Sequence, residues 1–264
     1  MHLQVLSSGS AGNCTLVRAG EVNLLIDAGL TLKELELRFE AAQFAARNIH
    51  HIALTHGHLD HARSSGSLTK RTGATLHLCE RLMRNKSVEQ APKMQTLRIG
   101  TATPLPHPDL PAAADPLELC ATLIPHDAVP TVAFRMEHKG RRAVYLTDMG
   151  EPAPAIASSL RDPHVLVLEF NHDPEMLRKG PYPINLKKRV GGRGGHLSND
   201  QGATVLGHLA GPNLHTLILA HLSLKNNTRE LAVAAAKAKL LELGLEGVNV
   251  LVADQDQIGP SIEV

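Results

Sequence analysis

Short apolar runs with the length of β-strands recur along the chain, separated by polar turns. The first three cover residues 3–6, 14–17 and 22–26. The others lie at residues 49–54, 76–78, 117–124, 131–136, 141–147, 165–170, 214–220 and 248–252. Lys139 and Gly140 separate two of these runs and predict a hairpin turn.

Amphipathic stretches predict helices over residues 31–47, from residue 80 onward and over residues 228–243. Five prolines within residues 101–116 predict a loop there. Groups of strands followed by helices are typical of an α/β fold in which two β-sheets pack face to face with helices outside. We expect a single domain over residues 1–264.

Composition limits the classes of protein that fit this chain. The 264 residues are 43% hydrophobic and 20% charged, which is enough for a folded core. The net charge of +1 excludes a globally basic nucleic-acid coat protein. Three scattered cysteines indicate reduced thiols. Since no secretion signal or membrane span is evident, we expect a cytoplasmic protein with no membrane partner.

The clearest chemical signal is the run Thr55-His56-Gly57-His58-Leu59-Asp60-His61, placed directly after a strand. Residues two positions apart on an extended loop can converge on one metal ion, and the next two can turn toward a second. Two divalent cations held in this way lower the pKa of water and bind the reacting oxygens. A polar loop that merely contains these residues is the alternative interpretation.

This motif resembles the hallmark of the metallo-β-lactamase fold superfamily. Further blocks are similar to one bacterial branch, the YycJ/WalJ-type nucleases, which are related to RNase J and tRNase Z. These blocks cover residues 6–13, 24–29, 170–177, 195–199 and 220–227. The resemblance spans about residues 3–252 and implies an αββα sandwich. Asp148 and His221 are only 73 positions apart, so a β-CASP insertion domain has no room.

The resemblance implies the remaining metal ligands, all at the ends of strands. It assigns His126, Asp148 and His221 to this role, with Asp148 bridging two divalent ions. The two ligand groups are His56, His58, His126 and Asp148, and Asp60, His61, His221 and Asp148. We expect Mn²⁺ to support activity, with Zn²⁺ as an alternative occupant. Asp27 is expected to fix the metal-binding loop by accepting hydrogen bonds from its backbone or from a ligand imidazole, or is simply a turn residue.

Three residues are candidates for chemistry on a phosphodiester. Asp60 orients the attacking water, and His196 donates a proton or contacts the transition state, as its likeness to a histidine of the relatives implies. His172 contacts the substrate. Capping of a helix is the structural alternative for both histidines.

A basic segment leads into His196 and predicts a phosphate-binding stripe. Its cations are Arg178, Lys187, Lys188, Arg189 and Arg193. The loop containing Ser8 and Asn13 is expected to add backbone donors to a phosphate. Aromatic residues make up only 2% of the chain, which disfavours a platform for stacking many bases. The expected partner is a single-stranded nucleic acid read through its phosphates.

These observations favour a dinuclear metal-dependent nuclease, a 5′→3′ exonuclease on single-stranded DNA and also RNA. Two alternatives stay open. One is a phosphodiesterase for small molecules or cyclic nucleotides, which does not need the basic segment. The other is a non-catalytic, metal-stabilised regulator that binds nucleic acid, which the full ligand set disfavours.

Overall fold

The computed structural model describes residues 1–109 and 116–264. In this part of the chain, two seven-stranded sheets have the strand orders β14-β1-β2-β3-β4-β5-β6 and β13-β12-β11-β10-β9-β8-β7. The expected α/β fold with two sheets and helices is confirmed. Residue contacts divide the chain into two compact units, so the single domain stays a prediction. Unit 1 contains Met1–Ala121, Met136–Arg141 and Asp254–Val264; unit 2 contains Thr122–Arg135 and Arg142–Ala253.

The first sheet combines antiparallel and parallel pairs. The antiparallel part pairs β14 with β1, β1 with β2 and β2 with β3, and the parallel part continues through β4, β5 and β6. The bounds are β1 His2–Ser7, β2 Cys14–Ala19, β3 Val22–Ile26, β4 His51–Ala53, β5 Thr75–Leu78, β6 Met94–Thr96 and β14 Ile262–Glu263. Alternating apolar side chains such as Leu3, Leu16 and Leu24 are fully buried, which explains why these segments form strands.

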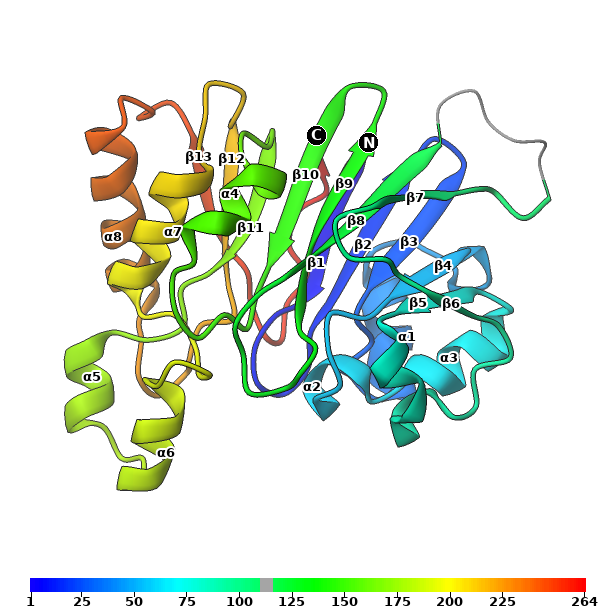
Figure 1. Ribbon diagram of the computed structural model, residues 1–264, viewed down its shortest axis with the longest axis horizontal. Helices are drawn as coiled ribbons and strands as arrows, with labels where there is room; N and C mark the ends of the chain where they lie inside the picture. The colour runs from blue at the N-terminus through cyan, green and yellow to red at the C-terminus, as the bar shows by residue number, and fades with distance from the viewer. Residues whose placement is uncertain (110–115) are drawn as a thin grey trace. The chain divides into compact units, whose positions relative to one another are not determined.

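Helices α1 and α3 contact strands β1 and β5 of the first sheet, and Figure 1 shows them in the blue and cyan part of the chain. The helices are α1 Leu32–Ala41, α2 Leu59–Ala62 and α3 Ser65–Thr72, with 3-10 turns η1 Ala46–Asn48, η2 Glu80–Arg84 and η3 Lys86–Val88. Thr31 begins α1 with a capping box to Glu34. The helix ends at Ala41 rather than near residue 47, because Gln43 takes a left-handed conformation. The helix expected from residue 80 is only a 3-10 turn.

The second sheet also mixes strand directions. β10, β11, β12 and β13 run parallel in succession, whereas β7 and β8 are antiparallel. The bounds are β7 Ala102–Leu105, β8 Leu117–Leu123, β9 Val132–His138, β10 Arg141–Leu146, β11 Val165–Glu169, β12 Thr216–Ala220 and β13 Asn249–Val252. The hairpin at Lys139 and Gly140 is confirmed, with positive φ at both residues. The loop expected over residues 101–116 is wrong where β7 forms, and residues 110–115 lie outside the described part.

Helices of unit 2 cover the parallel strands with apolar side chains. Figure 1 shows α7 and α8 together beside β11, β12 and β13, and α7 packs on α8. The helices are α4 Ala157–Leu160, α5 Pro174–Lys179, α6 Ile184–Val190, α7 Asn199–Leu209 and α8 Arg229–Glu242, with the 3-10 turn η4 Pro154–Ile156. Their core includes Leu166, Leu206, Leu217 and Ala236. No helix in the described ranges is long and apolar enough to cross a membrane.

Thr228 begins α8 by accepting a hydrogen bond from the backbone of Leu231 on its side chain. We expect Thr228→Ala to lower the free energy of unfolding by about 1 kcal/mol, because the first turn loses its cap. Urea denaturation followed by circular dichroism measures this change. Thr204→Ala, at an exposed position inside α7, is the control and should be neutral or slightly stabilising. Equal effects of the two changes would contradict the capping role.

Candidate metal centre

Strand pairing in unit 1 brings Asp27 and Thr55 together. The parallel register of β3 and β4 aligns Ile26 with Ala53, so both chains leave the sheet at the same edge. The buried Asp27 carboxylate accepts hydrogen bonds from the Thr55 amide at 2.9 Å and from the Thr55 hydroxyl at 3.0 Å and 2.9 Å. These donors fix the start of the histidine loop.

The same carboxylate orients a histidine of the motif. Nδ1 of His61 lies 2.7 Å from Oδ2 of Asp27, and both side chains are buried. Burial raises the pKa of Asp27, while His61 and Thr55 oppose that rise. With its proton on Nδ1, His61 has an unprotonated Nε2, which contacts the Asn13 side-chain amide and is a candidate ligand atom for a cation. The Asp27 carboxylate therefore contacts His61 directly, and its role in supporting a metal ligand stays a prediction.

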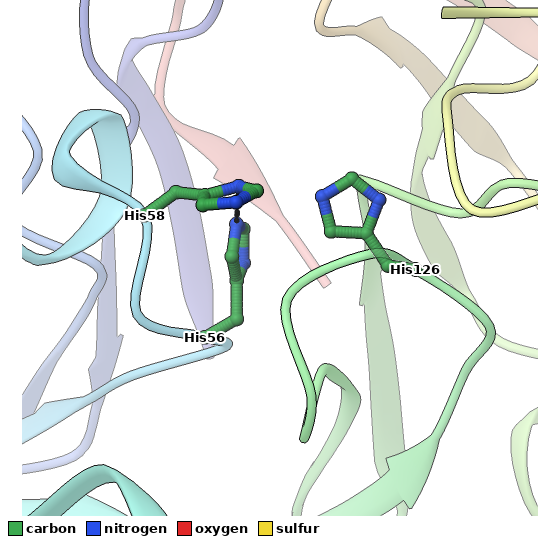
Figure 2. Close-up of side chains that lie close together, drawn as sticks. All are labelled: His56, His58 and His126. Atoms are coloured by element: carbon green, nitrogen blue, oxygen red, sulfur yellow. Dashed lines mark hydrogen bonds between the residues drawn. The ribbon is translucent and has the colours of Figure 1, made fainter. Parts of the chain in front are cut away.

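His56 and His58 meet at the tip of the same loop. Figure 2 shows their rings pointing toward one another, with 3.1 Å between Nε2 of His56 and Nδ1 of His58. The ring centres of His56 and His61 are 4.2 Å apart. Asp60 and His61 lie in α2, with 3.6 Å between Oδ2 of Asp60 and Nε2 of His61. Unit 1 thus gathers three imidazoles and a carboxylate.

The loop containing Ser8 and Asn13 is built into unit 1. Asn13 is fully buried, and its side-chain amide contacts the Gly9 carbonyl at 3.0 Å and Nε2 of His61 at 2.9 Å. The backbone amides of Ser8, Gly9 and Asn13 donate to Asp254, Asn13 and Asp60, respectively. Because these donors are already used, the expectation that they bind a phosphate is disfavoured, and phosphate contact by Ser8 and Asn13 stays a prediction.

A second group of donors lies at the carboxyl ends of parallel strands in unit 2. Asp148 follows β10, Glu169 is the last residue of β11, and His221 follows β12. His196 joins them from the glycine-rich segment before α7. Ligand atoms of the four residues all lie within 4.8 Å of one another. Carboxyl ends of adjacent parallel strands are where α/β sheets place ligands, which explains the cluster.

Glu169 is a buried residue of this cluster that the sequence analysis missed. Its Oε1 lies 2.8 Å from Nδ1 of His196 and 3.2 Å from Nδ1 of His221, and its Oε2 accepts from the amides of Met149 and Leu197. Although burial raises the pKa of Glu169, the histidines and hydrogen bonds outweigh it and lower that pKa to about 2. The sequence feature that could have revealed Glu169 is an acidic residue within the otherwise apolar run 165–170.

His126 lies on the loop that follows β8, and Figure 2 shows its ring. Its Nδ1 is 2.9 Å from the carbonyl oxygen of Gly195, which leaves Nε2 to face Asp148 at 4.0 Å and Asp127 at 3.4 Å. The carbonyl contact fixes the ring, in the manner usual for histidines that bind metals. Unit 2 therefore brings together the three ligands that the sequence predicted there: His126, Asp148 and His221.

Three residues of the two clusters share an uncommon backbone conformation. Asp27, Asp148 and His221 have φ values of 59°, 60° and 58°. A left-handed conformation is unfavourable for residues other than glycine and is frequent at functional sites. Asp27 and His221 directly follow the ends of β3 and β12, and Asp148 lies two residues after the end of β10, so all three lie at a sheet edge.

The two remaining catalytic candidates differ in environment. Burial lowers the pKa of His196, but the carboxylates of Glu169 and Asp148 outweigh this and raise it above its usual value. That environment favours a protonated imidazole. Burial lowers the pKa of His172 to about 4, so this imidazole is neutral near pH 7. Nδ1 of His172 is buried and has no hydrogen-bond partner among the described residues.

The basic segment is less uniform than its sequence indicates. Arg178, Arg189 and Arg193 pair with Glu175, Asp127 and Glu151, respectively. Nζ of Lys187 donates to the carbonyl oxygen of Arg178 at 2.8 Å. Three of the five predicted phosphate contacts are therefore partly neutralised by acids, while both lysines keep donors available.

The order of strands, the histidine motif and the donors at the strand ends define a class of protein. A model of the metallo-beta-lactamase superfamily matches residues 8–221, and the chain belongs to this superfamily. It is 30% identical over 246 residues to the exodeoxyribonuclease YycJ of Bacillus anthracis, across 92% of this chain and 90% of that protein. It is also 30% identical to the exodeoxyribonuclease WalJ of Streptococcus pneumoniae, across 93% and 90% of the two chains.

Solved structures agree with this assignment of the fold. The metallo-beta-lactamase fold protein YhfI of Bacillus subtilis matches with a TM-score of 0.70 and 16% identity, across 98% of each chain. At this identity the likeness shows the fold alone. Together the family and its named relatives confirm the predicted resemblance and support a metal-dependent nuclease or phosphodiesterase.

The donors within each unit fit divalent cations. Unit 2 offers four imidazole and carboxylate groups within 4.8 Å, and unit 1 offers a histidine whose far nitrogen is fixed by a carboxylate. Imidazole and carboxylate are ligands for both Zn²⁺ and Mn²⁺. The chemistry of the donor sets therefore agrees with metal binding, and the identity and number of ions remain predictions.

We expect Asp27→Asn to weaken metal binding by roughly 10- to 100-fold, because His61 loses the charged partner that orients it. Competition of the purified protein with a chelating dye measures this affinity. Circular dichroism verifies the fold. Glu40→Gln, which changes an exposed acid of α1, is the matched control and should bind metal normally. Normal affinity in the Asp27 variant would show that this carboxylate only shapes the turn.

Proposed function

We propose that the protein is a dinuclear metal-dependent nuclease that removes nucleotides from single-stranded DNA, and also RNA, in the 5′→3′ direction. The observation that carries the proposal is the full set of imidazole and carboxylate donors in a chain 30% identical to two named exodeoxyribonucleases. Superfamily membership alone covers many reactions, so the nuclease assignment depends on these relatives.

The proposed ligands are those predicted from the sequence. His56, His58 and His126 hold one ion, Asp60, His61 and His221 hold the other, and Asp148 serves both. Divalent cations bound there would lower the pKa of water and offset negative charge on the phosphate oxygens. Mn²⁺ is the proposed activating ion and Zn²⁺ an alternative occupant. Glu169 is added as the residue that holds His221 and His196 in place.

Residues of the chain supply the remaining chemistry. Asp60 is proposed to orient the attacking water through its carboxylate. His196 is proposed to protonate the departing oxygen, and its contact with Glu169 supports this role by favouring the imidazolium. His172 contacts the substrate as a neutral imidazole. The phosphates of the strand are proposed to bind the cations of the basic segment, Arg178, Lys187, Lys188, Arg189 and Arg193.

The structure of unit 2 supports a single-stranded substrate. Between Asp148 and His221 the chain forms η4, α4, β11, α5, α6, α7 and β12. These elements leave no segment for an inserted lid domain of the RNase J kind. Among the described residues of this stretch, Tyr182 is the only aromatic near the basic segment, so contacts to phosphates dominate.

Metal-stripped protein should not cleave labelled single-stranded DNA, and added Mn²⁺ should restore cleavage. Asp148→Asn should lower the rate by at least about 100-fold, because the shared carboxylate is lost. Digestion of 5′- and 3′-labelled strands measures this, and release of the 5′ label first establishes the direction. Glu151→Gln, an acid of the same loop that pairs with Arg193, is the control. Metal-independent cleavage would contradict the proposal.

Neutralising Lys187, Lys188 and Arg189 together should weaken binding of single-stranded DNA and reduce the slope of log affinity against log salt concentration by about two. Hydrolysis of bis-p-nitrophenyl phosphate should change little, because that substrate needs no long phosphate track. Fluorescence anisotropy at several salt concentrations measures the binding. An unchanged salt slope would favour the small-molecule phosphodiesterase instead.

A further inference from the structure

A cavity of about 590 Å³ in unit 2 is bounded by α5, α6 and the start of α7. We propose that this cavity binds one nucleotide of a single strand, with the base against its apolar wall and the phosphate against its lysines. The inference rests on the proposed function, because it specifies how that substrate is held. The volume falls within the range of about 300–1,000 Å³ that is usual for small-molecule sites.

The wall of the cavity is aliphatic. It includes Pro174, Leu177 and Ile184, and the Ile184 side chain is 70% exposed. Figure 1 shows α5 and α6 as two short neighbouring helices, and both contribute to the lining. Pro181 and Pro183 limit the freedom of the backbone that joins them. A large exposed apolar residue at the mouth of a preformed cavity fits the flat, apolar face of a base.

The charge of the cavity fits a phosphate. Three cations line it, Arg178, Lys187 and Lys188, and none of the described lining residues carries a carboxylate. Arg178 is held by two hydrogen bonds to Glu175. Nζ of Lys187 has three donors and uses one on a carbonyl oxygen, so Lys187 and Lys188 are the cations available to a ligand.

The inner end of the cavity carries hydrogen-bonding groups. His172 is 3% exposed and lines the cavity, and its buried Nδ1 has no hydrogen-bond partner in residues 1–109 and 116–264. Ser198 and Gln201 form the capping box at the positive end of α7, an 11-residue helix. A neutral imidazole and a helix start suit the polar edge and the phosphate of a nucleotide better than a purely apolar ligand.

The cavity adjoins the donor cluster within unit 2. The Asn199 amide donates to the carbonyl of His172, and the Leu197 amide donates to Oε2 of Glu169. A nucleotide in the cavity would thus lie next to the group that holds His196 and His221. A base must leave the stack of a duplex to enter such a cavity, so occupancy selects single strands.

The test measures binding of the full-length protein in excess EDTA, where no cleavage occurs. The probe is a fluorescent oligothymidylate of about eight nucleotides in which one abasic site is moved along the strand. One position should lower the affinity by about fivefold or more in the natural protein. Ile184→Ser should remove this dependence on position. Leu241→Ser, which changes an exposed leucine of α8, should retain it.

The outcomes separate this inference from the proposed function. Equal affinity at every abasic position would overturn the cavity as a base site even if the protein cleaves DNA. Competition by inorganic phosphate as strong as that by thymidine monophosphate would also overturn it, since only a phosphate would then be recognised. Loss of the position effect in the Ile184 variant alone would support the inference, whether or not cleavage is found.

Discussion

Two buried carboxylates organise the donor clusters, one in each unit. Asp27 and Glu169 are fully buried, and a buried charge is strongly unfavourable unless hydrogen bonds and opposite charges surround it. Asp27 meets this requirement with Thr55 and His61, and Glu169 with two backbone amides and two imidazoles. The hydrogen bonds that each buried carboxylate requires therefore fix the orientation of the neighbouring imidazoles, His61 in unit 1 and His196 and His221 in unit 2.

Parallel strands explain why the residues within each cluster lie close together. In each sheet the aligned carboxyl ends of neighbouring strands place the following residues at one edge. The left-handed conformations of Asp27, Asp148 and His221 then turn the chain sharply at that edge. Such conformations persist only where surrounding contacts enforce them, so the stability of the sheets maintains the geometry of the clusters.

The sequence was informative where local chemistry dictates the structure. Strand bounds such as Val22–Ile26, the turn at Lys139 and the cap at Thr31 follow from side-chain period, backbone preference and side-chain hydrogen bonding. β7 was missed because a proline-rich edge strand resembles a loop. Glu169 was missed because its role depends on contacts with residues 20 to 52 positions away. The contacts of the loop with Ser8 and Asn13 were hidden for a similar reason, since some partners of its amides are distant in sequence, and its phosphate contact stays a prediction.

The lining of the cavity and the donor cluster share one backbone segment in unit 2. The Asn171 amide donates to Leu197, the Leu197 amide donates to Glu169, and the Asn199 amide donates to His172. These bonds connect the inner end of the cavity to the carboxylate that orients His196. A ligand in the cavity and cations in the donor cluster would both stabilise this arrangement of hydrogen bonds. Because each would favour the same conformation, we expect binding of either one to lower the conformational cost of binding the other.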